Sequence, residues 1–221
     1  MKSRQTELTP ELINYIEENF SGEDFLLKQI SAECWTKHKI PQINITGYQA
    51  NFLQFIIKLI NPLNILEIGT LAGYSSIAMA RVSSERTRIL TIEKSKEYAD
   101  YAIENIIKAE LSHKIEVINA NAKQFLHSYN PTNKLDLIFI DADKHNYMNY
   151  FTILKEHLRC GGLFIFDNAF AFGFLLDSAP ERDANSTKSM LKFHNKLLNI
   201  GDFFTTIVPV GDGMLLSVKL K

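Results

Sequence analysis

The sequence predicts an α/β fold with a doubly wound, mostly parallel sheet of seven strands. Seven short apolar runs rich in Ile, Leu, Val and Phe recur along the chain, and helix-length stretches lie between the first five. These runs are almost continuously apolar, which indicates strands that are covered on both faces. Strands that alternate with helices form a parallel sheet through right-handed crossovers.

The predicted strands follow one another along the chain. The first five are residues 64–69, 88–93, 114–120, 135–141 and 162–167. The last two runs, "FFTTIVPVG" and "GMLLSVKL", are separated only by "DG" within "VGDGM", which is typical of a tight two-residue hairpin. We therefore expect the sheet to end in an antiparallel pair.

Two helices are predicted before the first strand. Thr9 is a suitable N-cap residue, and Pro10 follows at the first helical position. The second helix has apolar residues at helical spacing, namely Phe25, Leu26, Ile30 and Cys34. No repeat, low-complexity tract or flexible linker is recognisable in the sequence. We predict a single domain over residues 1–221, with an N-terminal helical segment over residues 1–45 packed on it.

Composition and charge exclude several classes of partner. The chain has 24 Lys and Arg against 25 Asp and Glu, and a net charge of -1 provides no basic surface for nucleic acid or an anionic membrane. The N-terminal stretch carries charged residues and no apolar core, so neither a signal peptide nor a membrane anchor is expected. Two cysteines, Cys34 and Cys160, are too few for a disulfide framework, which favours a reducing cytoplasm. The expected ligand is a small molecule.

A glycine-bearing turn follows the first predicted strand in "EIGTLAGYSS". Gly69 and Gly73 allow the backbone to turn sharply and approach a ligand closely. The spacing differs from the G-x-G-x-x-G pattern of dinucleotide sites, so a plain strand-to-helix turn remains an alternative. Glu93 ends the second strand, the position at which an acid of a nucleoside-binding sheet accepts hydrogen bonds from ribose hydroxyls. An ordinary helix N-cap or a surface charge is the alternative interpretation of this acid. With Glu67 and Asp141 it forms an acidic rim, which suits a positively charged cofactor.

The fourth and fifth predicted strands also end in polar side chains. Asp141 follows "LDLIFI", and Asp167 and Asn168 follow "LFIF". These residues either merely end two strands or converge on a metal ion, because neighbouring parallel strands bring their carboxyl ends together. Oxygen ligands of this kind suit Mg²⁺, Mn²⁺ or Ca²⁺. Lys144 is a candidate general base if burial and the cation lower its pKa, or else a solvated lysine beside an acid. Asp143 is interpreted as a helix-capping or surface carboxylate.

Five motifs occur in a characteristic order along the chain. They are "LEIGTLAGYSSIAMA", "TIEKSKEYADYAIENIIKAELSHKIEVINANA", "DLIFIDADKHNYMNYF", "GGLFIFDN" and "VPVGDGMLL". Together they resemble the cation-dependent O-methyltransferases, the group of caffeoyl-CoA and catechol O-methyltransferases, and more closely their bacterial members, over about residues 40–221. The resemblance implies a class I methyltransferase fold of Rossmann-like type, S-adenosylmethionine (SAM) as cofactor, a divalent cation that is Mg²⁺ by preference, and a homodimer.

The resemblance also assigns roles to individual positions. The glycine turn would hold the methionine part of SAM, the acid after the second strand the ribose, and residues after the third strand would flank the adenine. The implied cofactor contacts are Glu67, Gly69, Thr70, Ser75, Glu93, Ala120, Asn121 and Asp141. The implied metal ligands are Asp141, Asp167 and Asn168, and the implied catalytic residues are Lys144 and Asp141.

Two segments depart from the family pattern. Segment 38–50, which reaches over the active site in the family, has an altered arrangement of methionine and glycine. The sequence after Asn168 replaces a Trp-bearing insertion, and its Phe170–Leu176 segment would either wall an aromatic acceptor or form core or dimer contacts. We expect a metal-dependent O-methyltransferase for a small, catechol-like acceptor. A nicotinamide-dependent oxidoreductase and a non-catalytic cofactor-binding protein remain alternatives.

Overall fold

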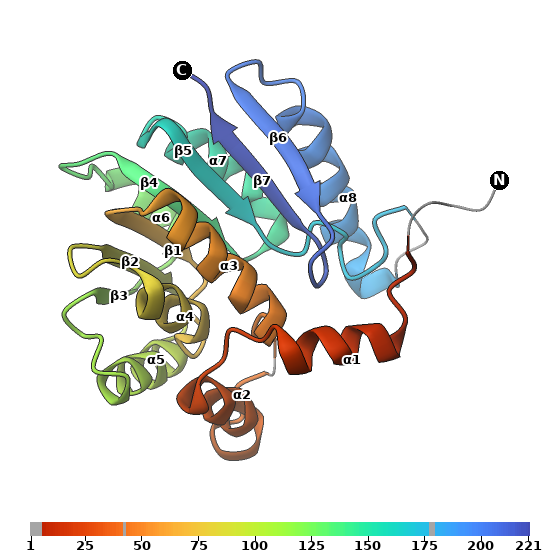
Figure 1. Ribbon diagram of the computed structural model, residues 1–221. Coiled ribbons are helices and arrows are strands. Elements are labelled where there is room, and N and C mark those ends of the chain that lie inside the picture. The colour runs from red at the N-terminus through yellow and green to blue at the C-terminus, as the bar shows by residue number, and fades with distance from the viewer. Residues whose placement is uncertain (1–5, 42, 177–179) are drawn as a thin grey trace.

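The fold has three layers, with one seven-stranded sheet in the middle (Figure 1). The structure, a computed structural model, describes residues 6–41, 43–176 and 180–221. The strands are β1 (Asn64–Ile68), β2 (Arg88–Glu93), β3 (Ile115–Asn119), β4 (Leu135–Ile140), β5 (Leu158–Phe166), β6 (Phe203–Val208) and β7 (Met214–Lys219). Their order in space is β3-β2-β1-β4-β5-β7-β6, and only β7 pairs antiparallel with its neighbours β5 and β6. The predicted doubly wound, mostly parallel sheet is confirmed.

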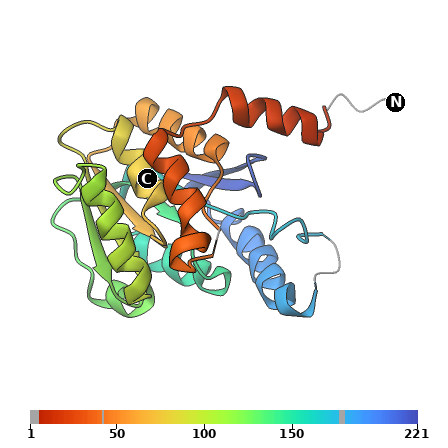
Figure 2. The same ribbon diagram turned by 90° about the horizontal axis from the view of Figure 1, so that it is seen from below.

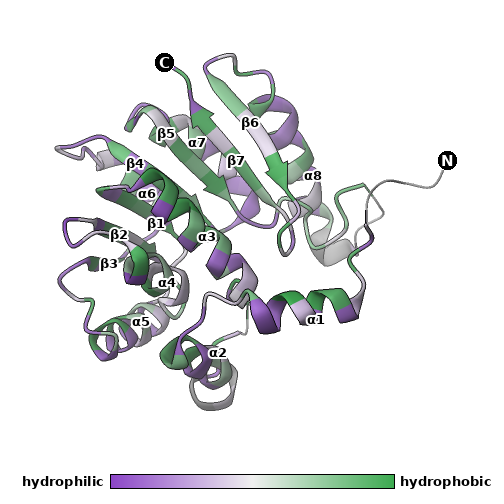
Figure 3. Cartoon of the chain, in the orientation of Figure 1, coloured by the Kyte–Doolittle hydropathy of each residue, from purple (hydrophilic) through white to green (hydrophobic). Residues whose placement is uncertain are grey.

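Helices cover both faces of this sheet. The layer on one face comprises α2 (Phe25–His38), α3 (Gly47–Ile60), α4 (Tyr74–Val82) and α5 (Lys96–Lys108). The layer on the other face comprises α6 (Ala122–Ser128), α7 (Tyr147–Leu154) and α8 (Glu181–Leu197). Along β4, Phe139 packs into the first core and Ile140 into the second, which is why the strands are apolar at successive positions (Figure 3). Among the described helices, none is long and apolar enough to cross a bilayer.

The C-terminal hairpin differs from the prediction. Val208 pairs with Met214, so the connection between β6 and β7 has five residues, 209–213, instead of two. Within this loop Gly213 N donates to Val210 O at 3.0 Å, so the turn is centred on Gly211 and Asp212. The Asp212 carboxylate also accepts a hydrogen bond from Phe172 N at 2.7 Å. The hairpin loop therefore anchors the segment that follows β5.

The two N-terminal helices differ in how much they contribute to the core. α1 (Pro10–Asn19) begins after the predicted Thr9 N-cap, buries none of its residues, and projects from the rest of the fold (Figures 1 and 2). α2 buries Ile30 and Cys34 completely or nearly so. Phe25, predicted on the same face, is 83% exposed because the buried face of the helix is formed by Leu27, Ile30 and Cys34, and Phe25 points away from it.

Candidate active site

The carboxyl edge of the sheet gathers several of the polar residues singled out in the sequence. Ile68 of β1 pairs with Ile140 of β4, and Ile140 pairs with Phe166 of β5. Asp141 and Asp167 are the next residues along β4 and β5, and their N–H groups donate to Ile68 O and Ile140 O at 2.9 and 3.0 Å. The backbone ladder thus continues up to both acids, which follow neighbouring strands at the same edge.

Gly69 is required where the end of β1 passes the end of β4. Its φ is +98°, and a Cβ at this position would lie 1.9 Å from the carbonyl oxygen of Asp141. Only glycine fits such an approach. Leu71, at φ 49°, and Gly73, at φ 79°, continue the turn in the left-handed region, and α4 starts directly afterwards. The glycine pattern that we interpreted as an approach to a ligand therefore also serves the packing of the sheet.

Glu67 lies fully buried beside this turn. Ser75 Oγ donates to its Oε1 at 2.5 Å, and the Ser76 hydroxyl donates to its Oε2. Burial raises the pKa of Glu67 to about 7, although the serine hydroxyls oppose the shift. The Thr70 hydroxyl is bonded to that of Thr91 at 2.6 Å. These contacts fix the start of α4 against β1 and β2.

Glu93 links the glycine turn to the end of β2. Its Oε2 accepts from Leu71 N at 3.0 Å, and its Oε1 accepts from Ser95 N at 2.9 Å. Each oxygen keeps a lone pair for a second donor. Ala120 lies next to Glu93, since Ala120 N donates to the Glu93 carbonyl at 2.9 Å, whereas Asn121 caps α6 through its side chain.

Lys144 is buried beside Asp141 at the start of the short 3-10 helix η1 (Lys144–Asn146). Its Nζ donates to Asp141 Oδ1 at 3.1 Å and to the Tyr147 hydroxyl at 2.8 Å. With 8% exposure it is not a solvated lysine. Burial opposes its charge, but Tyr147 and the carboxylates of Asp141 and Asp167 outweigh burial and raise the pKa of Lys144 above its ordinary value. This direction is opposite to the lowering that we expected for a general base.

Tyr147 completes this cluster, and our reading of the sequence did not select it. Its fully buried hydroxyl lies 3.2 Å from Ile140 O and 3.3 Å from Asp167 O, and it accepts from Lys144 Nζ. The hydroxyl therefore ties the ends of β4 and β5 to the lysine. Its position three residues after Lys144 could have indicated a contact with that lysine, but a tyrosine at helical spacing is equally typical of core packing.

Asp167 and Asn168 have properties that suit a cation site. Asp167 is 3% exposed, and its burial together with the charge of Asp141 raises the pKa of Asp167 to about 7. Asn168 follows in the left-handed region at φ 55°. Within the described residues, no three His, Cys, Asp or Glu side chains gather as a metal site, so a cation would depend on two carboxylates and the Asn168 amide. Such oxygen donors fit Mg²⁺, Mn²⁺ or Ca²⁺.

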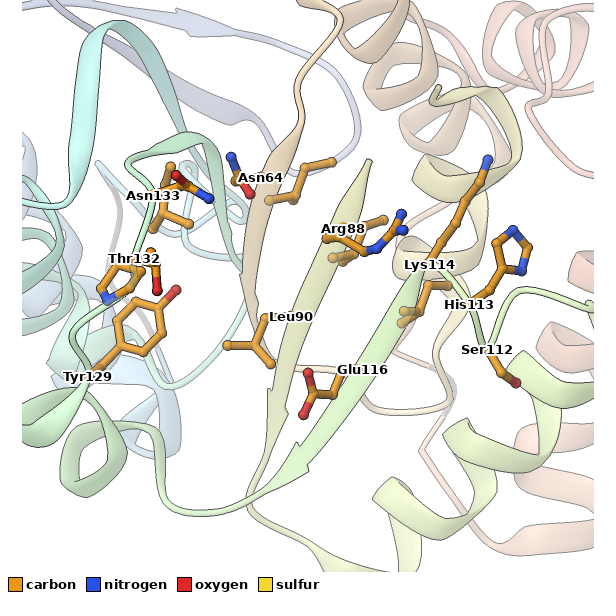
Figure 4. Close-up of a pocket in the computed structure, with 15 residues that line it drawn as sticks. Asn64, Arg88, Leu90, Ser112, His113, Lys114, Glu116, Tyr129, Thr132 and Asn133 are labelled. Atoms are coloured by element: carbon orange, nitrogen blue, oxygen red, sulfur yellow. The ribbon is translucent and has the colours of Figure 1, made fainter. Parts of the chain in front are cut away.

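A separate hollow of about 540 Å³ lies at the opposite edge of the sheet (Figure 4). It is lined by the starts of four strands, at Asn64, Arg88, Ile115 and Leu135. Ligands of parallel α/β sheets bind at the carboxyl ends of the strands, and these residues stand at the amino ends. The hollow is therefore distinct from the cluster around Asp141.

Comparison with known proteins assigns the family. Residues 17–220 match the family described as O-methyltransferase. The chain belongs to this family. A catechol O-methyltransferase of Niastella koreensis is 37% identical over 186 residues, which are 81% of this chain and 83% of the relative. Caffeoyl-CoA O-methyltransferase 2 of Populus trichocarpa is 32% identical over 200 residues, which are 86% and 80% of the two chains.

Solved structures agree with this assignment. An O-methyltransferase of Bacillus cereus in complex with SAH has a TM-score of 0.84 at 29% identity, covering 93% of this chain and 96% of that one. An O-methyltransferase of Streptomyces achromogenes involved in tomaymycin synthesis, in complex with SAM, has a TM-score of 0.84 at 26% identity, covering 96% of both chains. The class I methyltransferase fold and the family are thus confirmed, and the oxidoreductase alternative is not favoured.

Some residues of this O-methyltransferase have partners away from the cluster of Asp141, Lys144 and Asp167. Asp143, interpreted as a helix-capping or surface carboxylate, stands at the N-cap position of η1 but makes no side-chain cap bond, and it accepts from the Tyr150 hydroxyl at 2.7 Å. In the segment after β5, Phe172 and Leu176 are 55% and 89% exposed. Phe170 packs against Gly213 of the hairpin loop, where a Cβ would lie 2.8 Å from its ring. Both interpretations of Phe170–Leu176 therefore stand.

Segment 38–50 contributes a contact to the acids that our reading of the sequence missed. The structure describes this segment except for residue 42, and Gln49 Nε2 donates to Asp167 Oδ1 at 2.9 Å. Both side chains are buried, and they are separated by 118 positions in the sequence. The sequence signal at Gln49 was a capping box, T-x-x-Q, which identifies a helix start and does not reveal a distant partner.

Proposed function

We propose that this chain transfers a methyl group from SAM to a hydroxyl oxygen of a small, catechol-like aromatic acceptor, in a reaction that depends on a divalent cation. The observation that carries this proposal is the cluster of partly buried Asp141 with buried Lys144 and Asp167 beside the glycine turn. Family membership supports the reaction, and relatives named catechol and caffeoyl-CoA O-methyltransferases support the class of acceptor. Mg²⁺ is the preferred cation, with Mn²⁺ or Ca²⁺ as substitutes.

SAM would lie across the turn between β1 and α4, next to the ends of β2 and β3. Glu93 would accept hydrogen bonds from the ribose hydroxyls on the lone pairs that its two backbone donors leave free. Solved relatives with bound SAM or SAH support this placement. The cofactor residues in this proposal are Glu67, Gly69, Thr70, Ser75, Glu93, Ala120, Asn121 and Asp141.

Asp141, Asp167 and Asn168 would hold the cation. Once bound, it supplies positive charge that lowers the pKa of the acceptor hydroxyl, which for a phenol lies near 10. The two carboxylates would also orient the acceptor oxygen relative to the SAM methyl group, since they stand on adjacent strand ends next to the glycine turn. Tyr147 holds those strand ends together through its hydroxyl.

Lys144 would take the proton of the acceptor hydroxyl at Nζ. The Tyr147 hydroxyl and Asp141 Oδ1 fix the position of Nζ, at 2.8 and 3.1 Å. Because Tyr147 and the nearby carboxylates raise the pKa of Lys144, the amine would become a base only when the negative charge around it is balanced. In this proposal Asp141 orients Lys144 as well as holding the cation.

We further propose that the enzyme is a single domain over residues 1–221 and a homodimer in the cytoplasm. Exposed apolar side chains on the projecting helix α1, including Ile13 at 45% and Tyr15 at 55%, support an interface between copies. Cys34 and Cys160 are both free thiols, which fits a reducing compartment.

The test is transfer of a labelled methyl group from SAM to a panel of catechols and hydroxycinnamoyl esters. We expect EDTA to abolish the transfer, Mg²⁺ or Mn²⁺ to restore it, and Asp167→Ala to behave like the chelated enzyme, because a site with so few protein ligands tolerates little loss of charge. Full activity after exhaustive chelation would contradict the cation requirement. Calorimetric binding of NAD in place of SAH would contradict methyl transfer itself.

A further inference from the structure

We infer that Gln49 is a positioning residue that orients the Asp167 carboxylate toward the cation and couples it to the start of α3. The inference rests on the proposed cation site. Gln49 Nε2 donates to Asp167 Oδ1 at 2.9 Å, and this bond joins α3 to the end of β5. Gln49 and Asp167 are 4% and 3% exposed, so solvent does not compete for the contact.

The hydrogen-bond partners of Gln49 fix which way its amide points. A carboxylate can only accept, so the group that faces Asp167 is the NH₂. On the other side, Gln49 Oε1 accepts from Thr46 N at 3.0 Å, and a backbone N–H can only donate. Thr46 Oγ1 in turn accepts from Gln49 N at 3.2 Å, which completes the capping box of α3. Turning the amide over would lose both bonds at once.

The hairpin loop between β6 and β7 confines this amide. Gly211 has a φ of +57°, and a Cβ at this position would lie 2.3 Å from Gln49 Cδ and 2.6 Å from Gln49 Oε1. Figure 1 shows the same loop beside the start of α3. The loop backbone therefore packs closely against the Gln49 amide, so the start of α3, the hairpin loop and the end of β5 meet around this side chain.

A neutral donor at this position has a specific consequence for cation binding. The amide fixes the rotation of the Asp167 carboxylate and occupies Oδ1, yet it leaves the negative charge of the group intact. In this inference Oδ2 is the oxygen that would face the cation. The ammonium of Lys144, in contrast, is directed to Asp141. Groups that orient a metal ligand in this way typically contribute a factor of about 10 to 100 in metal affinity.

The experiment measures Mn²⁺ binding without cofactor or acceptor, from the electron paramagnetic resonance signal of the free ion. Gln49→Met keeps the length of the side chain and removes the amide. Thr46→Ala is the matched control, because it weakens the same helix cap and leaves the bond to Asp167 in place. Asp167→Ala removes the proposed ligand itself. Gly211→Ala displaces the amide from the hairpin side and replaces Gln49→Met if thermal melting shows that the latter does not fold.

We expect Gln49→Met to raise the Kd for Mn²⁺ about 10- to 100-fold, Thr46→Ala to change it less than about threefold, and Asp167→Ala to abolish binding. Wild-type Mn²⁺ affinity in Gln49→Met, with binding lost in Asp167→Ala, would overturn the inference and leave the cation site standing. An equal loss in Thr46→Ala and Gln49→Met would also overturn it, because the effect would then come from the helix. Wild-type affinity in Asp167→Ala would refute the cation site together with the inference.

Discussion

Replacing Asp167 by Asn is expected to stabilise the cation-free protein at neutral and higher pH. Burial and the charge of Asp141 raise the pKa of Asp167 from its ordinary value of 3.8 to about 7. Between these two values the folded state holds a proton that the unfolded chain has released. The free energy of unfolding of the wild type therefore falls as pH rises through this window.

The size of the effect follows from the same shift. Each pH unit within the window corresponds to about 1.4 kcal/mol, so ionising Asp167 should cost roughly 2 to 3 kcal/mol between about pH 5 and about pH 8. An asparagine at this position is neutral at every pH, and its Oδ1 can still accept from Gln49 Nε2. The stability advantage of Asp167→Asn should thus grow by that amount over this range.

The measurement is urea unfolding followed by far-ultraviolet circular dichroism, with EDTA present, at both pH values. Asp202→Asn is the control because that carboxylate is 61% exposed, and it should change stability by less than about 0.5 kcal/mol at either pH. An equal difference between Asp167→Asn and wild type at the two pH values would refute the claim that burial and Asp141 oppose ionisation of Asp167.

Three further substitutions test individual contacts. Glu93→Ala removes the acceptor for Leu71 N and Ser95 N. It should weaken SAH binding about 10- to 100-fold in calorimetry while the Mn²⁺ affinity stays unchanged. Unaltered SAH affinity would reject the ribose assignment. Lys144→Met should lower kcat about 100- to 10,000-fold while SAH and Mn²⁺ still bind, and this loss of kcat should shrink as pH rises. A change in kcat below about threefold at every pH would rule out Lys144 as the general base. Tyr147→Phe removes the hydroxyl that contacts Lys144 Nζ and Ile140 O. It should lower kcat about tenfold or more and destabilise the protein by about 1 to 3 kcal/mol in urea unfolding. Unaltered kcat would limit Tyr147 to a structural role.

The sheet is predictable because its strands are buried on both faces. Phe139 and Ile140 enter different cores, so the run "LDLIFI" is apolar at adjacent positions and stands out from the helices around it. The hairpin is not predictable in the same way. "DG" favours a two-residue turn locally, but hydrogen bonds from the segment after β5 to Asp212 compete with that preference, and they depend on residues about 40 positions away.

The candidate site is predictable only in part, for a related reason. Asp141 and Asp167 stand out because each follows a strand, and parallel strands end at a common edge. Gln49 and Tyr147 do not, because capping a helix and packing in a core explain them equally well until their partners are known. The direction of the pKa shift of Lys144 also depends on tertiary contacts, since burial alone lowers it and the neighbouring groups reverse its sign.

Burial is the main cause of the raised pKa of Asp167, and Tyr147 contributes most to the raised pKa of Lys144, but the charge of Asp141 adds to both. A nearby negative charge discourages Asp167 from losing its proton and encourages Lys144 to keep its own. Asp141 supplies such a charge to both and therefore favours the protonated form of each group. In the proposed reaction Asp167 has to be ionised to hold a cation, and Lys144 has to be neutral to accept a proton. A divalent cation that balanced the negative charge would lower both pKa values together. In this proposal Lys144 would stay protonated while the charge of Asp141 is unbalanced, and a cation held by Asp141, Asp167 and Asn168 would favour the neutral amine that accepts the proton.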